Sequence, residues 1–166
     1  MAENHKPPPP AKLDHFEMLG MIVSLWSGLE LLIDSITWRL ANMPKKTGAC
    51  ITANILSIHI KLDCLIALCY HRNATQKTLD DLKKFKLRLY GTSEKRNRIV
   101  HDPWSIEMLP DGSLAMSQTT ITAKGKPQFN DHVVPIEELE ATYEEITVRI
   151  DEFIKIKDQL AGQSLT

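Results

Sequence analysis

The sequence predicts a mainly α-helical protein: a four-helix bundle with a small β-sheet insert before the last helix. Four segments carry apolar residues at helical spacing over stretches long enough to share one core. A chain of 166 residues with 43% hydrophobic residues is large enough to bury such a core. A threonine-rich stretch with turn signals separates the third segment from the fourth. We therefore expect one domain over residues 13–162, with the β insert at 104–134.

The first two helices are predicted from their apolar stripes. Before them, residues 1–12 contain four consecutive prolines among polar neighbours, which favours an extended, disordered tail. The first helix is expected at 14–42, where it meets a break that contains proline and glycine. The second is expected as one continuous helix over 49–72, because its isoleucines and leucines recur at alternating spacings of four and three.

The third helix is expected at 76–102 and the last helix at 136–160. Pro103 ends the third helix, because a proline disfavours helical backbone in the residue before it. Gly91, followed by two hydroxyl residues, could bend this helix or divide it. The last helix has glutamates in its first turn, where the helix dipole favours negative charge.

The insert between these helices is expected to form a β-hairpin and a short third strand. Apolar and polar residues alternate after Pro103, a Pro-Asp-Gly turn follows, and a threonine-rich strand comes next. A second turn is expected at 124–127 and a third strand at 132–135. The insert could pack on the bundle as an edge or form a lip over a site, and the sequence leaves both arrangements open.

The third helix carries a charged residue on its core-facing stripe. Continuing the spacing of Leu82, Phe85 and Leu89 leads to Ser93 and then to Arg96. An unpaired buried charge costs several kcal/mol, so this arginine needs a partner or a wet cavity.

A carboxylate on the first helix is the candidate partner. Glu30 falls inside the apolar arc of that helix, where it could pair with Arg96 or orient His101. Alternatively, Glu30 lies at the rim of the core, with its stem packed and its head in water. Asp102, directly after His101, is a second supporting carboxylate.

The end of the third helix carries a motif. Asn97 and His101 lie four residues apart on one helical face, whereas Arg96 points about 140° away from His101. These three residues, with Pro103 and Trp104 behind them and helices in front, resemble the Arg-x(4–6)-His signature of the HEPN superfamily. The resemblance implies a small helical bundle that forms a homodimer, and in many members a metal-independent endoribonuclease.

The chemistry that the resemblance implies is cleavage of RNA by the substrate's own 2′-hydroxyl, which leaves a cyclic phosphate. His101 would move protons near neutral pH, and Arg96 would stabilise the charge that develops on the phosphate. Asn97 would orient the imidazole or donate to a phosphate oxygen. The competing structural interpretation is that Arg96 pairs with Glu30 or Asp102 while the histidine caps its helix.

Global charge does not indicate a nucleic-acid partner, because 20 basic and 21 acidic residues leave a formal net charge of -1. An RNA would have to be held by a local patch. Lys95 and Arg98 flank the motif and are the residues that we expect to meet its phosphates.

Three cysteines in a long chain without a signal peptide predict a reducing, cytoplasmic environment. No metal site is expected, because Cys64 and Cys69 diverge by about 140° on a helix and no Cys-x-x-Cys pair occurs. No cofactor is expected either, since the chain has no glycine-rich phosphate loop. Charged residues interrupt each long apolar stretch, so no membrane-spanning segment is expected.

A homodimer is expected on two further grounds. A two-fold axis near the motif would bring Arg96 of one subunit beside the partner's His101, and pairing two basic clusters would create a positive cleft. Several apolar residues of the first helix lie outside its main stripe and are available to a partner: Met18, Met21, Leu25, Leu31 and Leu32. In a monomer, these residues would instead pack under the insert.

A different class of function also fits the sequence. The chain could be a catalytically inactive dimeric module that binds or regulates another protein, such as an antitoxin or a component of a neighbouring enzyme. The near-neutral charge favours this alternative, and the intact arginine, asparagine and histidine favour the ribonuclease. The two differ in whether Arg96 and His101 face a shared solvent-filled cleft or are buried against carboxylates.

Overall fold

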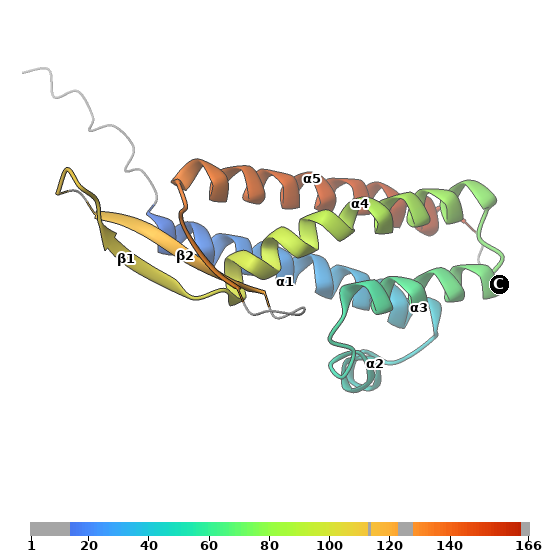
Figure 1. Ribbon diagram of the computed structural model, residues 1–166. Coiled ribbons are helices and arrows are strands. Elements are labelled where there is room, and N and C mark those ends of the chain that lie inside the picture. Colours follow the sequence, from blue (N-terminus) through green and yellow to red (C-terminus); the bar gives the residue numbers. More distant parts are fainter. Residues whose placement is uncertain (1–13, 113, 123–127, 164–166) are drawn as a thin grey trace, which may run out of the picture.

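The computed structural model describes residues 14–112, 114–122 and 128–163. Within these residues the protein is mainly helical, with a small antiparallel sheet directly before the last helix (Figure 1). This confirms the predicted class and the position of the β insert. The tail expected at 1–12 and the turn expected at 124–127 lie outside the described residues.

The helices are α1 (His15–Leu40), α2 (Lys45–Thr52), α3 (Ile58–His71), α4 (Gln76–His101) and α5 (Ile136–Ala161), and the strands are β1 (Trp104–Met108), β2 (Leu114–Thr122) and β3 (Gln128–Val133). The predicted bounds of the first, third and last helices are correct to within two residues. Helix α4 continues without interruption through Gly91.

Helix α1 begins at a reciprocal cap that the sequence encodes locally. The Asp14 side chain accepts a hydrogen bond from the backbone N–H of Glu17 at 2.8 Å, and the Glu17 carboxylate accepts one from the N–H of Asp14 at 3.0 Å. These bonds satisfy two N–H groups, one of them on the first turn, where no helical partner exists. The start of α1 is therefore fixed locally, and the His15 ring lies 2.9 Å from the carbonyl oxygen of Val134, directly after the sheet.

The second helix is predicted wrongly, because the structure divides it into α2 and α3. Residues 53–57 form no helix. The Asn54 side chain donates to the carbonyl oxygen of Cys50 at 2.8 Å, a local bond of the kind that competes with helix continuation. Helix α2 also starts earlier than expected, directly after Pro44, since a proline at a helix start removes no helical hydrogen bond.

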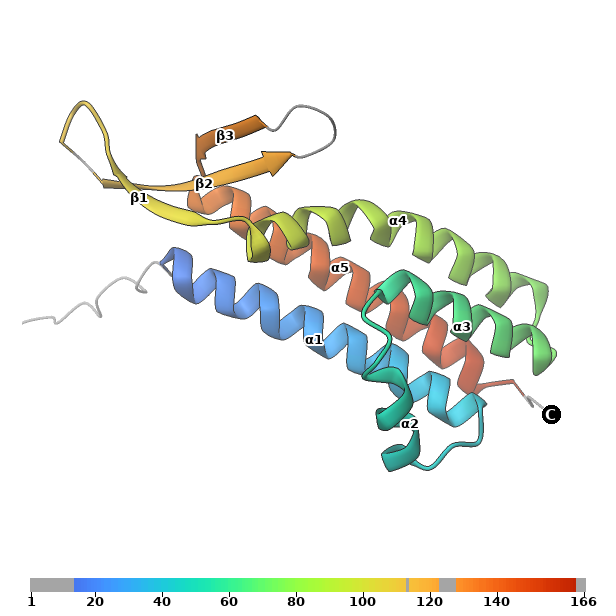
Figure 2. The same cartoon turned by 60° about the horizontal axis from the view of Figure 1, so that its bottom comes forward.

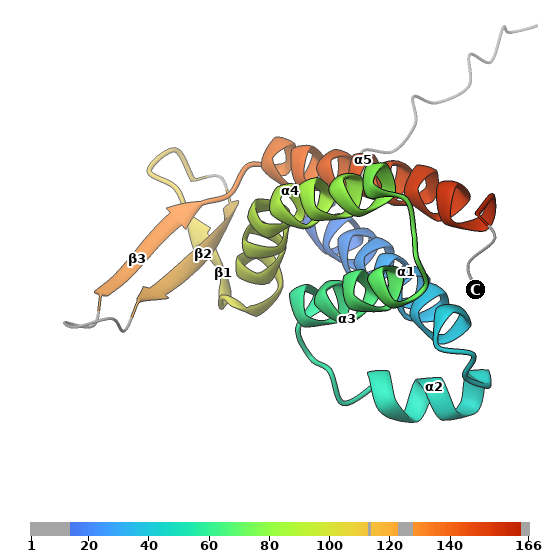
Figure 3. The same cartoon turned by 90° about the vertical axis from the view of Figure 1, so that its right-hand side faces the viewer.

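Helix α2 packs against the indole ring of Trp38, near the end of α1. A Cβ atom added at Gly48 would lie 2.4 Å from carbons of that ring, so only glycine permits the approach. The indole Nε1 also donates to the Thr52 hydroxyl at 3.2 Å. This packing holds α2 apart from α3 (Figure 3), which explains why a helical pattern across residues 49–72 is not one helix.

Helices α1, α3, α4 and α5 surround one hydrophobic core (Figure 2). Helix α1 packs against α3 and α5, and α4 packs against the same two helices. The largest fully buried side chains are Phe85, Phe153, Ile22, Leu29, Ile33, Leu62, Leu65, Leu82, Leu89, Leu139, Ile146 and Leu160. The apolar faces of these four helices therefore meet in this core.

A buried ion pair lies between α1 and α3. The Lys61 ammonium donates to the Asp34 carboxylate at 2.8 Å, with the two side chains only 9% and 11% exposed. The other carboxylate oxygen, Oδ1, is buried and has no hydrogen-bond partner in the described part of the chain. Lys61 alone thus neutralises the negative charge of Asp34 among the described residues.

Helix α3 is much shorter than its neighbours, with 14 residues against 26 in α1 and in α4. Its first turns lie beside the middle of α4, where the rings of His59 and Tyr90 are 5.2 Å apart. Lys61 reaches α1 at Asp34, and the residue after α3, Arg72, reaches the end of α1 at Leu40. The N-terminal half of α1 and the last turns of α4 are therefore not covered by α3 (Figure 2).

The sheet has the order β1-β2-β3, with all pairs antiparallel. Gln118 on β2 lies opposite Trp104 on one side and His132 on the other. Trp104 is half-buried and Gln118 is buried against the end of α4, so the insert packs on the bundle as an edge. The predicted third strand exists but begins at Gln128, and Val134 turns into the core instead of extending the strand.

By length and apolar composition alone, α1 could cross a membrane, which corrects the expectation that no segment would qualify. The core helix of a soluble protein meets the same criteria, and α1 contributes Ile22 and Leu29 to the core.

A second correction concerns the residues expected to be free for a partner. Met18 is buried in the core, Met21, Leu25 and Leu32 are half-buried, and only Leu31 of the five is exposed.

Candidate active site

The motif lies at the end of α4, where side chains of the sheet satisfy the last backbone carbonyls. The Trp104 indole donates to the carbonyl oxygen of Ile99 at 2.8 Å, and the Gln118 amide donates to that of Arg98 at 2.9 Å. Asp102 leaves the helix with extended backbone before Pro103, as predicted. Because the final carbonyls of a helix lack helical partners, these bonds from β1 and β2 hold the motif in place.

Arg96 lies half-buried between α4 and α1. Its guanidinium carbon is 5.5 Å from the centre of the Trp26 ring, and its Nη1 donates to the Asn97 side-chain oxygen at 3.1 Å. The Nε atom is buried and has no hydrogen-bond partner in the described part of the chain. Arg96 therefore interrupts the apolar stripe of α4 as expected, and the face of the Trp26 ring stabilises its positive charge.

Glu30 supports this arrangement without forming an ion pair. Its carboxylate accepts a hydrogen bond from the Trp26 indole at 3.3 Å. No carboxylate of the described residues lies within 4.0 Å of the Arg96 nitrogens. Burial lowers the pKa of Arg96 below its ordinary value, whereas the charge of Glu30 acts in the opposite direction. Glu30 therefore fixes the indole on which the arginine rests.

The other two motif residues are exposed on the surface of α4. Asn97 is bound to Arg96 and is thus placed to orient the guanidinium, not the imidazole. His101 lies in the last helical turn with its side chain exposed. Asp102 carries a buried oxygen, Oδ2, with no hydrogen-bond partner, and its carboxylate forms no ion pair with the arginine or the histidine in the described part of the chain. The competing interpretation, in which Arg96 pairs with Glu30 or Asp102, does not match this geometry.

A cavity of about 290 Å³ lies beside the motif, where α3 does not cover α1 and α4. We call it the α1–α4 groove, and its lining is mainly apolar: Leu19, Gly20, Val23, Ile99, Val100 and Trp104. A Cβ atom added at Gly20 would meet nothing within 4 Å, so the groove is open along α1. Neither Arg96 nor His101 lines this groove, and one chain alone does not bring the two into a shared cleft there.

A second cavity, of about 240 Å³, lies on the other side of α4, between that helix, the sheet and the start of α5. We call it the α4–sheet pocket, and its charged and amide lining consists of Lys95, Arg98, Gln118, His132 and Glu138. It brings together the two cations that the sequence predicted to meet phosphates. Gln118 and His132 were not predicted, and only the strand register places them here.

The two predicted RNA-binding cations differ in their surroundings. Lys95 forms an ion pair with Glu145 of α5 at 2.7 Å, whereas Arg98 is exposed and has no ion pair within the described residues. Burial alone would raise the pKa of Glu145, but hydrogen bonds from Lys95 and Thr92 bring that pKa below its ordinary value. Arg98 is therefore the free positive charge of this pocket.

The cysteines do not gather with other metal ligands. Cys50 is exposed, Cys64 is half-buried and Cys69 is buried, and all three are free thiols. Among residues 14–112, 114–122 and 128–163, no group of three or more histidine, cysteine and acidic side chains could hold a metal ion.

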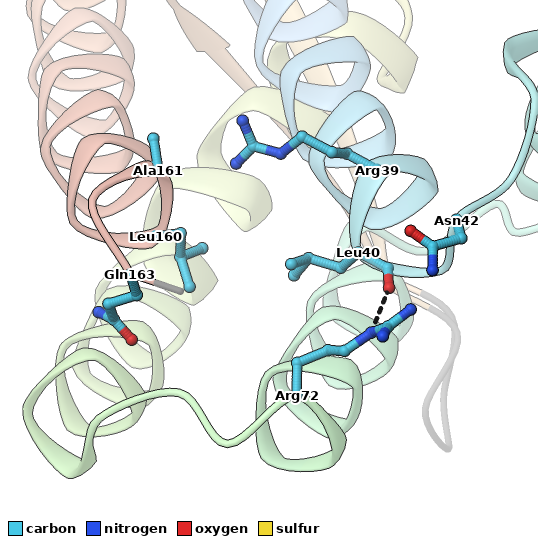
Figure 4. A pocket seen from close by; sticks show the side chains of 7 residues that line it. All are labelled: Arg39, Leu40, Asn42, Arg72, Leu160, Ala161 and Gln163. Carbon is cyan, nitrogen blue, oxygen red and sulfur yellow. Dashed lines mark hydrogen bonds between the residues drawn. The ribbon is translucent and has the colours of Figure 1, made fainter. Parts of the chain in front are cut away.

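A polar cavity of about 310 Å³ lies at the opposite end of the helices from the sheet (Figure 4). Arg72 donates from Nε to the carbonyl oxygen of Leu40 at 2.8 Å, which satisfies a carbonyl at the end of α1 that has no helical partner. Arg39 reaches toward α5 across the same cavity. The role of Arg72 in this cavity is therefore structural. The cavity is remote from the motif.

Comparisons with models of protein families, with curated proteins and with solved structures gave no match to this chain. The resemblance to the HEPN superfamily therefore rests on the sequence motif and its place in the chain.

Proposed function

We propose that this chain is a metal-independent endoribonuclease of HEPN type, with α1, α3, α4 and α5 as its four-helix bundle and with its active site completed in a homodimer. One observation carries the proposal: Arg96 keeps its guanidinium half-buried with no carboxylate partner among the described residues, on the same helix end as the exposed His101. A purely structural arginine at such a site would be expected to gain a carboxylate. An unneutralised cation suits an anionic substrate.

The proposed reaction needs only groups of the protein and of the RNA. The 2′-hydroxyl oxygen attacks the adjacent phosphorus while the His101 imidazole accepts its proton. The bond from phosphorus to the 5′-oxygen breaks, that oxygen takes up a proton from solvent, and the imidazolium returns its proton to solvent, which leaves a 2′,3′-cyclic phosphate and a 5′-hydroxyl. Arg96 stabilises the charge on the phosphate oxygens, and Asn97 acts as a positioning residue for Arg96.

A second copy of the chain is the proposed occupant of the α1–α4 groove. The groove is open because α3 stops short of it, and exposed apolar residues of α1 border it or continue its face: Phe16, Val23 and Leu31. A two-fold axis here would complete the bundle on its open side and place two motifs close together. Since Arg96 and His101 diverge by about 140° on one helix, each active site would combine residues of both subunits.

The alternative of an inactive, dimeric regulatory module has one observation in its favour. Arg96 is already bound by Trp26 and Asn97, so it could serve packing alone. We also propose that a protein regulator could bind the chain, whether it is the ribonuclease or the inactive module. We place both forms in the reducing cytoplasm, in keeping with the free cysteines.

The test is a cleavage assay on single-stranded RNA in the presence of a metal chelator. We expect the wild type to release fragments with cyclic phosphate ends, and His101→Ala and Arg96→Ala to lose activity by about a thousandfold, as general acid–base and electrostatic roles require. His71→Ala is the matched control, because His71 is an exposed histidine at the end of another helix. RNA that contains 2′-deoxy nucleotides should resist cleavage.

Two results would contradict the proposal. Cleavage that persists in His101→Ala would exclude the histidine from the mechanism. A purified dimer of wild-type chains that leaves all tested RNA intact would favour the regulatory module.

A further inference from the structure

The α4–sheet pocket collects basic side chains from two separate elements. Lys95 and Arg98 are three residues apart on α4, so they share one face of the helix. His132 arrives from β3, where it pairs with Gln118 of β2. Directly opposed residues of an antiparallel pair project to the same face of the sheet, so His132 and Gln118 both face the pocket.

Gln118 makes this arrangement rigid. It is 3% exposed, and its amide nitrogen donates to the carbonyl oxygen of Arg98. The strand that carries it is therefore tied to the same helical turn as one of the two α4 cations. The pairing of β2 with β3 and the bond from Gln118 to α4 thus fix the positions of Lys95, Arg98 and His132 relative to one another.

Arg98 gives the pocket a cation that can meet an anion. Among the described residues of the lining the charged side chains are Lys95, Arg98 and Glu138. Lys95 shares its charge with Glu145 outside the lining. Within the part of the chain that the structure describes, Arg98 has no ion pair, so its guanidinium is available for the planar recognition of phosphate oxygens.

The size of the pocket also suits such a group. A volume of about 240 Å³ corresponds to about eight water molecules at about 30 Å³ each. That space admits a phosphate together with part of its sugar. The adjoining apolar surface comes from Ile99 and Ala141, which can contact a ribose ring.

The pocket is also close to the motif along the helix. Arg98 and His101 are three residues apart, which is about 4.5 Å of axial rise and about 60° of rotation. A strand of RNA bound at His101 would therefore pass directly over Arg98.

We propose that the α4–sheet pocket, built from Lys95, Arg98, Gln118 and His132, binds a backbone phosphate of RNA next to the one that is cleaved. This inference rests on the proposed ribonuclease function and assigns to the β insert a role in substrate binding. The insert then contributes His132 to the binding site. Through Gln118, it also fixes the end of α4 that carries Lys95 and Arg98.

The first experiment measures RNA binding without cleavage. Fluorescence anisotropy with a labelled single-stranded RNA is recorded on the His101→Ala protein, alone and combined with Arg98→Ala, His132→Ala or Lys84→Ala. Lys84 is the matched control, because it is an exposed lysine on the same face of α4, about 16 Å from Lys95 by helical rise.

We expect Arg98→Ala and His132→Ala each to weaken binding about fivefold to tenfold, and Arg98→Ala also to reduce the salt dependence by about 0.7 in the logarithmic slope. Lys84→Ala should change the affinity less than twofold. Equal affinities for all of these proteins would overturn the pocket, even if the wild type cleaves RNA.

The second experiment locates the bound phosphate and distinguishes a free phosphate or mononucleotide from RNA as its source. Amide NMR shifts are followed as inorganic phosphate, uridine 3′-monophosphate or the RNA is added. Shifts at residues 118–120 and 132 with the monophosphate and with the RNA, reduced in Arg98→Ala, support the proposal. Shifts with the monophosphate but not with the RNA would overturn the proposal that this pocket binds RNA, whereas the ribonuclease function is decided separately by the cleavage assay. No shift in this region with any of the three probes would overturn the pocket.

Discussion

The guanidinium of Arg96 rests on the indole ring of Trp26, with 5.5 Å between the guanidinium carbon and the ring centre. The contact joins the motif on α4 to the core of α1, and the Glu30 carboxylate holds the indole from its other end. An aromatic face leaves the positive charge available to a substrate, whereas a carboxylate in contact would neutralise it. The relationship therefore links the packing of the bundle to the proposed chemistry.

Trp26→Phe tests this link. The change retains an aromatic ring but removes the bond to Glu30 and weakens the cation–π contact, which is worth about 0.5 to 2 kcal/mol. We expect RNA cleavage to fall by about tenfold through kcat, because Arg96 is less well positioned. Trp38→Phe is the matched control, since it also removes one indole hydrogen bond, to Thr52, at a site far from the motif. Similar losses of activity in both variants would refute the positioning role.

The composite active site can be tested by mixing two inactive variants. Arg96→Ala and His101→Ala are unfolded together and refolded, so that half of the dimers contain one chain of each kind. If each site uses the arginine of one subunit and the histidine of the other, every mixed dimer holds one intact site. We expect about a quarter of wild-type activity to return. An inactive mixture would show that both residues act within the same chain.

The buried pair of Lys61 and Asp34 should be important for stability. Lys61→Met would leave a buried carboxylate without its cation, and one oxygen of Asp34 already lacks a partner. We expect the free energy of unfolding to fall by about 3 to 5 kcal/mol, measured by urea denaturation. Lys86→Met is the control, because its pair with Asp63 is largely exposed and worth about 0 to 1 kcal/mol.

The double variant Lys61→Met with Asp34→Leu removes both charges. It should recover most of the lost stability, since no buried charge remains. A cost below 1 kcal/mol for Lys61→Met alone would indicate that water reaches the carboxylate.

The cysteines should differ in reactivity and in their effect on stability at high pH. Burial raises the pKa of Cys69 from its ordinary value of 9.0 to about 11, so its thiol stays protonated where the unfolded chain begins to ionise. The free energy of unfolding is therefore unaffected by this group below about pH 9 and decreases between about pH 9 and 11.

A thiol reagent at pH 8 should modify exposed Cys50 quickly and Cys69 only after unfolding. Cys50→Ser removes the fast phase and serves as the control. Rapid modification of Cys69 in the native protein would show that α3 opens locally.

Much of the helical framework was determined by the sequence alone. The periodic apolar stripes predicted α1, α4 and α5, because each of these long helices buries one continuous face and has a local end signal, such as Asp14 or Pro103. The hairpin after Pro103 followed from alternation and turn residues, which are also local features. The charged interruption at Arg96 was visible in the same way, as a break in a stripe.

The tertiary structure decided what local patterns do not encode. Residues 49–72 have helical spacing throughout, yet the chain breaks there because Gly48 packs against Trp38, ten residues earlier. Glu30 was a candidate partner for Arg96, but the approach of α1 to α4 placed the Trp26 indole against the guanidinium instead.

The α4–sheet pocket depends in the same way on long-range pairing. His132 lies 34 residues after Arg98, and the two line one pocket only because β2 pairs with β3 and Gln118 bonds the end of α4. Periodicity along the chain reports which face of an element is buried, whereas the side chains that meet across elements are decided by strand register and helix packing.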